Sequence, residues 1–572
     1  MNFEQPWQWK KWALRAALLG LVVLAVQFAV AWAQTPPAPA AAPAAAAPAA
    51  PPPPAGDPAG LNTDGPLYTP NSYLSGWGTG VSQKPDGSDW KAYKNPDNPT
   101  TAELGKNVAK AFYSINFVWT LICGFLVMFM QAGFALVETG LIRAKNVGHT
   151  MAMNFMVYGI GMTGFFVMGF ALLCGGAAGS PIGAPGPLGS IPVLGDMFSI
   201  KVGGFDWGLF GTTGFFLMGK SYDAAAIVWF LFMMVFMDTT ATIPTGAMAE
   251  RWKFSSFFVF SFFIGAIIYP LYGNWVWGGG WLAELGLGAG LAHGVVDYAG
   301  SSVVHLQGGS LALVGALALG PRLGKYDAQG RPKAIPAHSI PMAVLGTFIL
   351  AFGWFGFNAG SSLAGSDGRI AIIATNTMLA SASGAIFATI YHWFFHKKPD
   401  VTMMCNGMLA GLVAITAPCA FVAPWAAFLI GAIAGVLVVV SVYFIERRGI
   451  DDPVGAISVH GVNGAWGVLS LGLFADGTYG QGFNGVGFNE YLGKAGLGVT
   501  GLFYGDGKQF IAEVIAVVVC VTWNVVMGAL CLKITGLIVG GNRTSRENEE
   551  TGLDITEMGA PGYTGFRLEE TR

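Results

Sequence analysis

The chain has 572 residues, of which 53% are hydrophobic and only 11% are charged, and its formal net charge is −2. An ordinary soluble domain carries about 25% charged residues, so this composition excludes a soluble domain and indicates a protein with many transmembrane helices. The near-neutral charge argues against a nucleic-acid partner. Eighty-three glycines and eighteen tryptophans fit the same class, because Gly is frequent in membrane helices and Trp anchors their ends.

The first apolar stretch is typical of a secretory signal peptide rather than of a transmembrane helix. Three basic residues precede an apolar run over 16–30, and a small-x-small triplet that ends at Ala33 follows. We expect cleavage after Ala33, which makes 1–33 the signal peptide and leaves the mature N-terminus outside the cytoplasm. An uncleaved membrane anchor is the alternative.

Two polar segments separate this signal from the rest of the chain. Residues 34–60 are almost wholly Ala and Pro, lack apolar periodicity and predict an extended linker. Residues 61–111 are mostly polar and rich in turn dipeptides, and they predict a short extracytoplasmic segment.

Eleven apolar runs, each long enough to cross a bilayer, follow between residues 112 and 540. They lie near 112–137, 150–174, 223–249, 254–277, 301–320, 340–358, 370–395, 403–421, 424–445, 455–474 and 509–538. The predicted fold is an all-α membrane domain over 112–540, with a polar tail over 541–572.

The distribution of basic residues predicts the orientation of these spans. Lys and Arg are concentrated in alternate short connections, for example Arg143 with Lys145 and Arg322 with Lys325, whereas they are sparse in the longer connections between. By the positive-inside rule the basic connections are cytoplasmic. The N-terminus of the domain is then outside and, after an odd number of spans, the tail is in the cytoplasm. We expect a multi-pass protein of the bacterial inner membrane.

The cysteines show no pattern of a metal site or of a disulfide framework. All six lie in or beside apolar stretches without the paired spacing of a zinc site, so we expect buried thiols, no disulfide framework, no metal and no cofactor. They are Cys123, Cys174, Cys405, Cys419, Cys520 and Cys531.

An internal repeat singles out two histidines. The segments Asp297-Tyr-Ala-Gly-Ser-Ser-Val-Val-His305 and Asp452-Pro-Val-Gly-Ala-Ile-Ser-Val-His460 share Asp, Gly, Val and His at the same spacing. By the predicted topology the first starts the fifth span from outside and the second starts the tenth span from inside. This relation predicts an inverted repeat of five plus five helices with one extra helix.

The repeat predicts where the two histidines lie. Counted along a helix from its Asp, each His lies about 12 Å deeper, which is near the middle of the bilayer, and we expect the two side chains to meet there. Ionisable residues in membrane spans usually face an internal path. Two ordinary buried core histidines, or two ligands of a haem, are the alternatives. The remaining histidines are interpreted as interfacial or surface residues: His149, His293, His338, His392 and His396.

At this point the chain resembles the ammonium transporter family, in its Amt branch. The resemblance is carried in order over residues 112–563 by the segment Asp297–His305 and by further motifs. These are Arg143-Ala-Lys-Asn146, Ala249-Glu-Arg251, Trp277-Gly-Gly-Gly280, Gly353-Trp-Phe-Gly-Phe-Asn-Ala-Gly-Ser361, Val459-His-Gly461 and Gly552-Leu-Asp554.

The resemblance implies a role for each matching residue. His305 and His460 would be the twin histidines of a pore, and Phe236 and Phe357 would be two stacked rings that close its outer mouth. Trp277, Phe236 and Ser361 would form the outer ammonium site, with Asp297 below it as the acid that shapes it. The family also implies a homotrimer with one pore per subunit, and a PII-type regulator on the cytoplasmic face.

Elementary chemistry agrees with these roles. Aromatic faces attract a desolvated cation by about 2 kcal/mol or more, but a bare cation in an apolar pore faces a large desolvation penalty. Splitting ammonium into ammonia and a proton avoids that penalty, and two touching imidazoles can pass the proton. The predicted function is therefore ammonium transport through a hydrophobic pore with a proton relay. An ammonium sensor that signals through a PII-type partner, and an Rh-like ammonia or carbon dioxide channel, are the alternatives.

Three further features need testing against a structure. Asp238 follows Phe236 where many relatives carry small neutral residues, and we favour a structural role in which its carboxylate bonds to neighbouring threonines. The outer loop over 175–222 is long for the family and predicts a different cover for the mouth. In the tail, we expect Gly552 to about Tyr563 to pack against the cytoplasmic loops and so to couple neighbouring subunits of the trimer; a solvated, disordered tail is the alternative.

Overall fold

The computed structural model describes residues 101–179, 188, 194–477 and 498–563. The expected signal peptide (1–33), the linker (34–60) and the polar segment up to residue 100 therefore lie outside the described residues, as do parts of the loop over 175–222 and the last nine residues of the tail.

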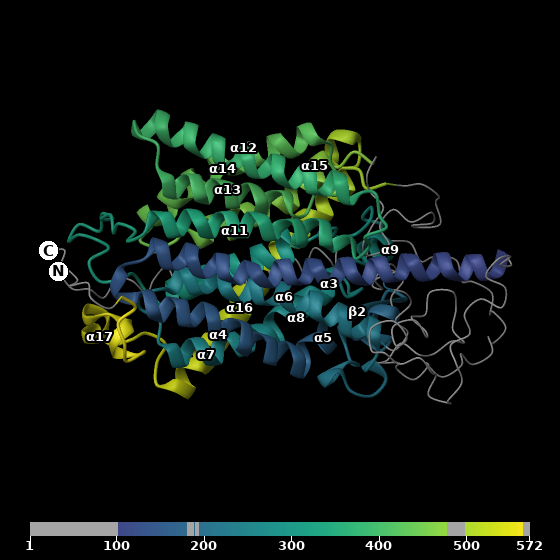
Figure 1. Cartoon of the computed structure of the whole chain (residues 1–572), viewed down its shortest axis with the longest axis horizontal. Coiled ribbons are helices and arrows are strands. Elements are labelled where there is room, and N and C mark those ends of the chain that lie inside the picture. Colours follow the sequence, from purple (N-terminus) through teal and green to yellow (C-terminus); the bar gives the residue numbers. More distant parts are fainter. Residues whose placement is uncertain (1–100, 180–187, 189–193, 478–497, 564–572) are drawn as a thin grey trace.

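Long helices that run side by side form the described protein (Figure 1). In the first half of the membrane domain, five helical runs are long and apolar enough to cross a bilayer. They comprise α3 (Thr101–Leu141), α4 (Val147–Gly164) with η2 (Phe165–Gly169) and α5 (Phe170–Cys174), α6 (Ala224–Met248), α7 (Phe254–Phe263) with η8 (Ile264–Ile268) and α8 (Tyr269–Val276), and η9 (Ser301–Leu306) with α10 (Gln307–Leu319).

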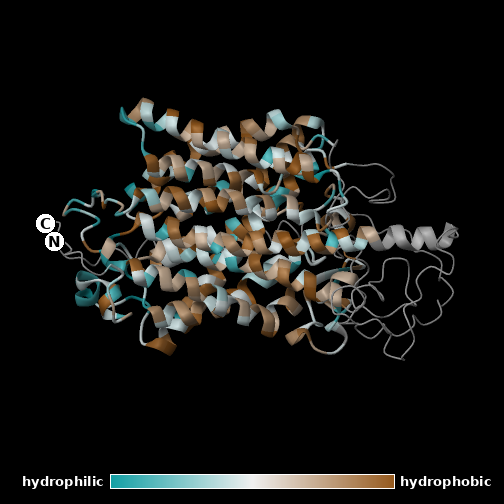
Figure 2. Cartoon of the chain, in the orientation of Figure 1, coloured by the Kyte–Doolittle hydropathy of each residue, from teal (hydrophilic) through white to brown (hydrophobic). Residues whose placement is uncertain are grey.

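Five more such runs make up the rest of the bundle. They comprise α11 (Ile340–Asn358) with η10 (Ala359–Ser362), α12 (Ile370–His396), α14 (Pro424–Arg447), η11 (Ile457–Val462) with α15 (Asn463–Phe474), and α16 (Gly507–Val539). Hydrophilic residues gather at the two ends of the bundle (Figure 2). Ten of the eleven predicted spans thus coincide, within several residues, with described helices of sufficient length.

The remaining predicted span, 403–421, coincides with a shorter apolar helix. This helix, α13 (Val401–Ile415), has 15 residues, and the chain continues in turns to residue 422. A bilayer core needs about 20 helical residues, so α13 alone does not reach that length. It nevertheless packs against both α12 and α14 and is buried along most of its length.

The first helix is longer than its sequence predicts. α3 begins at Thr101 and has 41 residues, so the end of the predicted polar segment is helical. At 1.5 Å per residue it is about 60 Å long, roughly twice the bilayer core of about 30 Å. Its N-terminal part extends beyond the other helices (Figure 1).

The two ends of the bundle are different. One end, here called the hairpin end, carries the antiparallel strands β1 (Met197–Val202) and β2 (Phe205–Gly211), together with α9 (Leu285–Ala289). The hairpin covers the end of α8, because the Trp275 indole donates to the Leu209 carbonyl at 2.9 Å and the Trp281 N–H donates to the Gly208 carbonyl at 2.9 Å. The long loop over 175–222 therefore contributes a folded cover.

The opposite end, here called the tail end, carries α17 (Arg546–Thr551) and α18 (Leu553–Thr556). Leu553 is fully buried, and its N–H donates to the Asn146 side-chain oxygen at 2.9 Å. The Asp554 carboxylate accepts the His149 N–H at 2.8 Å, and Lys145 Nζ donates to the carbonyl of Glu549 at 2.7 Å. These contacts confirm that the tail packs against the loops.

The docked tail contacts two of the remaining histidines. His149 was expected on the surface, but it is fully buried, and its Nε2 lies 3.5 Å from a carboxylate oxygen of Glu557 in the tail. His338 bonds through Nε2 to the Tyr563 hydroxyl at 2.9 Å. His293 and His392 are also buried, each less than 10% exposed, whereas His396 is exposed. Burial thus contradicts a surface position for His149, His293 and His392, because later segments of the chain cover them, whereas His392 does lie near the end of α12 as predicted.

A buried network of charges lies beneath the tail. Glu250 pairs with Arg143 and with Arg322, whose guanidinium also donates to Asp451 at 2.8 Å. Burial raises the pKa of Glu250, but the two guanidinium groups outweigh it and lower that pKa below its usual value. The network keeps both acids ionised and links four loops of the tail end to one another.

Candidate pore and substrate site

Both repeated motifs form the start of a helix. Gly300 (φ 113°) and Gly455 (φ 80°) are left-handed, which favours glycine, and each precedes a π-helical segment, η9 or η11, that contains the motif's histidine. The helix predicted to start at Asp297 therefore begins only at Ser301. The depth calculation assumed a continuous helix and is wrong in that detail, although the two halves do correspond as the repeat predicts.

The aspartates of the two motifs cap these helix starts. Asp297 accepts five hydrogen bonds of 2.6–3.0 Å: from the N–H groups of Gly300, Ser301, Ser302 and Val303, and from the Ser302 hydroxyl. Asp452 accepts the N–H of Gly455 at 3.0 Å and of Ile457 at 2.7 Å. Both carboxylates satisfy backbone donors that have no partner in the first helical turn.

The two histidines meet, as the repeat predicted. The Nδ1 atoms of His305 and His460 are 3.1 Å apart, and their rings are stacked at 5.2 Å with an interplanar angle of 22°. In such a pair one Nδ1 donates and the other accepts. Both rings are buried, and no described residue forms a hydrogen bond with His305 Nε2. The pair can therefore pass a proton from one ring to the other.

Close approach of the two helix starts holds this pair together. A Cβ atom on Gly464, just after His460, would lie 2.6 Å from the Ser301 carbonyl oxygen and 2.8 Å from the Leu306 nitrogen. Any larger residue would push the helices apart. Glycine at this position thus permits the contact of the histidines.

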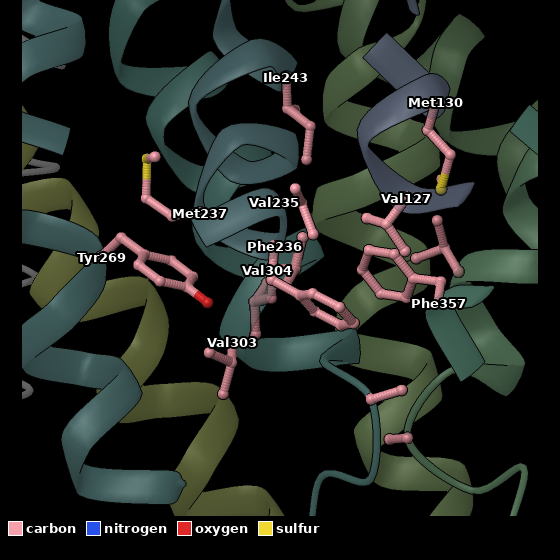
Figure 3. Packing of buried hydrophobic residues seen from close by; sticks show 14 of the residues in the cluster. Val127, Met130, Val235, Phe236, Met237, Ile243, Tyr269, Val303, Val304 and Phe357 are labelled. Carbon is pink, nitrogen blue, oxygen red and sulfur yellow. The ribbon is translucent and has the colours of Figure 1, made fainter. Parts of the chain in front are cut away.

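Aromatic rings line one side of the histidine pair. Phe236 of α6 and Phe357 of α11 are stacked at 4.1 Å with an angle of 26°, and they lie side by side in Figure 3. Phe357 in turn stacks on His305 at 5.5 Å. Trp354 also stacks on His305, at 5.2 Å and 19°. The sequence analysis did not assign Trp354 a role, although it lies within the motif that contains Phe357.

The rings of Phe236 and Phe357 and the histidine pair form one file of contacting side chains. The predicted outer site continues this file toward the hairpin end. The Trp277 ring meets Phe236 edge to face at 6.0 Å and 76°, and its indole N–H donates to the Asp297 carbonyl at 2.6 Å. Asp297 therefore positions Trp277 with its backbone, while its carboxylate is fully used by the helix start. Trp277, Phe236 and Phe357 are all buried.

Ser361 lies one turn beyond Phe357 in η10. Its hydroxyl donates to the Phe357 carbonyl at 2.7 Å, so its oxygen lone pairs remain available to accept a hydrogen bond. The structure thus brings Phe236, Phe357, Trp277, His305 and His460 into one file of contacts, to which Asp297 and Ser361 are joined by hydrogen bonds.

A small cavity lies on the other side of His460, toward the tail end. Its lining is mainly apolar and includes Phe134, Ile243, Leu350 and Val459, together with His460. Two polar side chains, Glu138 and Asn406, also line it. The sequence analysis did not single out Glu138, although an acid within an apolar span was the signal that could have found it.

Another acid in the spans, Asp238, does not bond as predicted. It is 2% exposed, and one of its carboxylate oxygens has no hydrogen-bond partner in the part of the chain that the structure describes. The hydroxyls of Thr239 and Thr240 instead donate to the carbonyls of Val235 and Phe236. The predicted hydrogen bonds from these threonines are therefore wrong, because the helix offers them nearer backbone acceptors.

Among the described residues, no group of three or more His, Cys, Asp or Glu side chains has the arrangement of a metal site. The six cysteines are all buried and free. The chemistry available in the file of contacts is thus that of aromatic rings, two imidazoles and hydrogen-bonding oxygens.

Comparisons with known proteins point in one direction. Residues 118–563 match the model of the Ammonium Transporter Family. The ammonium transporter Amt2 of Archaeoglobus fulgidus is 48% identical over 460 residues, which cover 80% of this chain and 90% of that protein. The ammonium transporter of Bacillus subtilis is 32% identical over 447 residues, 78% of this chain and 98% of that protein.

Solved structures agree. A protein titled Sensor Amt Protein is 33% identical, with a TM-score of 0.65 over 78% of this chain and 99% of that one. Mep2 of Candida albicans is 26% identical, with a TM-score of 0.63 over 76% of this chain and 87% of that one.

Proposed function

The chain belongs to the Ammonium Transporter Family, and from this premise we propose that it moves ammonium nitrogen across a bacterial inner membrane. It recruits ammonium at an outer aromatic site, removes a proton and conducts ammonia through an apolar pore. The twin histidines relay the proton. The contact between His305 and His460, in line with the stacked Phe357 and Phe236, is the observation that carries this proposal.

We propose eleven membrane-crossing helices, with α13 as the short eleventh. The hairpin end then faces outward, after cleavage of the signal peptide, and the tail end faces the cytoplasm. The basic residues Arg143, Lys145, Arg322 and Lys325 at the tail end support this orientation. The chain forms a homotrimer, as its resemblance to the family implies, with one pore in each subunit.

At the outer site, Trp277 and Phe236 attract ammonium through their faces, and Ser361 accepts one of its N–H groups. The site must replace the water that ammonium loses when it binds. Aromatic faces can do so, because a desolvated cation–π contact contributes about 2 kcal/mol or more. Asp297 acts without contacting the ion. Its backbone carbonyl accepts the Trp277 indole N–H and so positions that ring, and its buried negative charge favours a nearby cation.

Deprotonation follows because the file beyond the phenyl rings contains no polar group before the histidines. Ammonium gives a proton to His305, and the neutral ammonia that remains crosses the apolar path. The proton moves from His305 to His460 through their Nδ1 contact. Potassium has no proton to give, so the same path rejects it despite its similar size.

The proposal is tested with the full chain in liposomes. A pulse of ammonium should drive nitrogen uptake, whereas potassium at the same concentration should give none. Equal responses to both cations would refute selection by deprotonation, and no ammonium uptake at all would refute the transport function.

A second candidate is an ammonium sensor. It is favoured by one observation, the 33% identity to the Sensor Amt Protein, and it would act through a PII-type partner on the tail end. In that case ammonium would bind without crossing the membrane and would alter affinity for the partner.

A further inference from the structure

The cavity on the tail side of the histidines contains a buried acid, Glu138. We propose that Glu138 and Asn406 form a second ammonium-binding site, in which ammonia regains a proton after it passes His460. The inference rests on the proposed function and assigns the exit half of the path. In the step itself, the lone pair of ammonia takes the proton of the His460 imidazolium, which leaves ammonium and a neutral ring.

Hydrogen bonds fix one edge of the Glu138 carboxylate. Its Oε2 accepts from Asn154 Nδ2 at 2.7 Å and from the Thr245 hydroxyl at 2.7 Å. Asn154 is held in turn by Gln131, which donates to its carbonyl at 2.6 Å and accepts from Thr242 at 2.8 Å. The network spans α3, α4 and α6, so the position of the carboxylate is set by three helices.

The other edge of the carboxylate lies beside the backbone of Gly246. Among the described residues no side chain hydrogen-bonds to Glu138 Oε1, yet the residue is 97% buried and lines the cavity together with His460. Asn406, across the same cavity, donates through Nδ2 to the Val454 carbonyl at 3.2 Å, which leaves its Oδ1 as an acceptor. Two side chains with acceptor oxygens thus line a space that an imidazole also borders.

The charges around the cavity suit a cation. None of the ion pairs between described residues includes Glu138; the arginines of the tail end pair with Glu250, Asp451 and Glu549. The acid that lies near enough to act on Glu138 is Asp452, whose carboxylate caps a helix. A buried carboxylate without a basic partner is unfavourable, so this site gains by holding a positively charged donor.

Ammonium matches these groups by its chemistry. It is a small cation that carries only donors, and the site offers only acceptors: a carboxylate oxygen and an amide oxygen. Its charge is neutralised where it forms, so the ion does not face the desolvation penalty that the apolar path imposes.

A purely structural role of Glu138 makes a different prediction. If the carboxylate only ties α3 to α4 and α6, its replacement by Gln lowers stability but leaves transport per folded molecule unchanged. If it binds the product ion, transport falls more than stability. Asp238→Asn is the matched control, because it removes a second buried carboxylate, on α6, that does not line the cavity.

The experiment uses full-length protein in liposomes and ammonium as the probe. Uptake and ammonium-driven current are measured beside the thermal unfolding midpoint for Glu138→Gln, Asn406→Leu and Asp238→Asn. We expect Glu138→Gln to lower uptake and current about tenfold or more, the effect of losing a hydrogen bond to a charged group. Asn406→Leu should lower both by a smaller factor, and Asp238→Asn should keep both within about twofold.

Each outcome distinguishes an ammonium-binding role of Glu138 from a purely structural one. Wild-type uptake and current in Glu138→Gln and Asn406→Leu would overturn the exit site while the twin-histidine transport function stands. An equal loss in Asp238→Asn would also overturn it, by showing that any buried acid has this effect. If Glu138→Gln fails to fold, Asn406→Leu decides the matter. If the wild type itself takes up no ammonium, the proposed function fails and the exit site fails with it.

Discussion

The helix start that carries His305 should depend on its aspartate more strongly than the helix start that carries His460 does. Asp297 accepts five hydrogen bonds, including one from a hydroxyl, whereas Asp452 accepts from two backbone N–H groups within 3.0 Å. Asp297→Ala and Asp452→Ala remove the same side chain from equivalent positions of the repeat. The difference between them therefore isolates the three additional bonds.

The size of that difference follows from the bond count. Hydrogen bonds inside membrane proteins average about 0.6 kcal/mol, and bonds to a charged group contribute about 1.5 kcal/mol at the low end of their range. Three bonds then amount to about 2–4.5 kcal/mol. We expect Asp297→Ala to lower the free energy of unfolding by that much more than Asp452→Ala does.

Unfolding of both variants in the same detergent, followed by Trp fluorescence, measures this difference. Asp297→Ala should also lower transport per folded molecule, because the Asp297 backbone and the start of η9 position Trp277 and His305. Equal unfolding free energies, or a larger loss for Asp452→Ala, would refute the view that the five bonds of Asp297 hold the helix start.

Three further predictions address the mouth and the tail. Trp277→Leu should raise the half-saturating ammonium concentration up to about 30-fold, the equivalent of about 2 kcal/mol, whereas Trp425→Leu, at an exposed position, should not change it. Truncation before Gly552 should lower transport with assembly intact; transport like that of the full chain would make the tail passive. Burial raises the pKa of Glu557, but hydrogen bonds from His149 and from the Phe254 N–H outweigh it and lower that pKa. The ionised Glu557 carboxylate stabilises the docked tail fully at pH above the ordinary pKa of Glu, about 4.3. This stabilisation is lost as the pH falls through the lower pKa that Glu557 has in the docked tail. Proteolysis of the tail should therefore increase in acid, and less so in Glu557→Gln.

Periodicity and length were sufficient to predict most of the fold. Each long span is a continuous apolar run, and such runs have few alternatives to a membrane helix. The contact between His305 and His460 was predictable because the repeat relates the two halves by symmetry. The start of the helix at Ser301 was also within reach, since Asp297 followed by Gly300 is itself a capping pattern.

Other features depend on contacts that no local pattern reveals. His149 is buried only because residues about 400 positions later fold over it. Asp238 lacks its predicted partners because helical backbone carbonyls compete for the threonine hydroxyls. The cavity beside Glu138 arises where α3, α6, α11, α13 and the start of η11 meet, and its lining could not be assembled from sequence spacing.

The central claim is that the two histidines carry the proton that ammonium leaves behind. Electrical recording from liposomes that contain the full-length protein, during a jump in ammonium concentration, tests it most directly. The account predicts a transient current in the wild type and its loss in the double variant His305→Ala, His460→Ala, with the unfolding midpoint showing a folded protein. An unchanged ammonium-driven current in that double variant would contradict the proton relay.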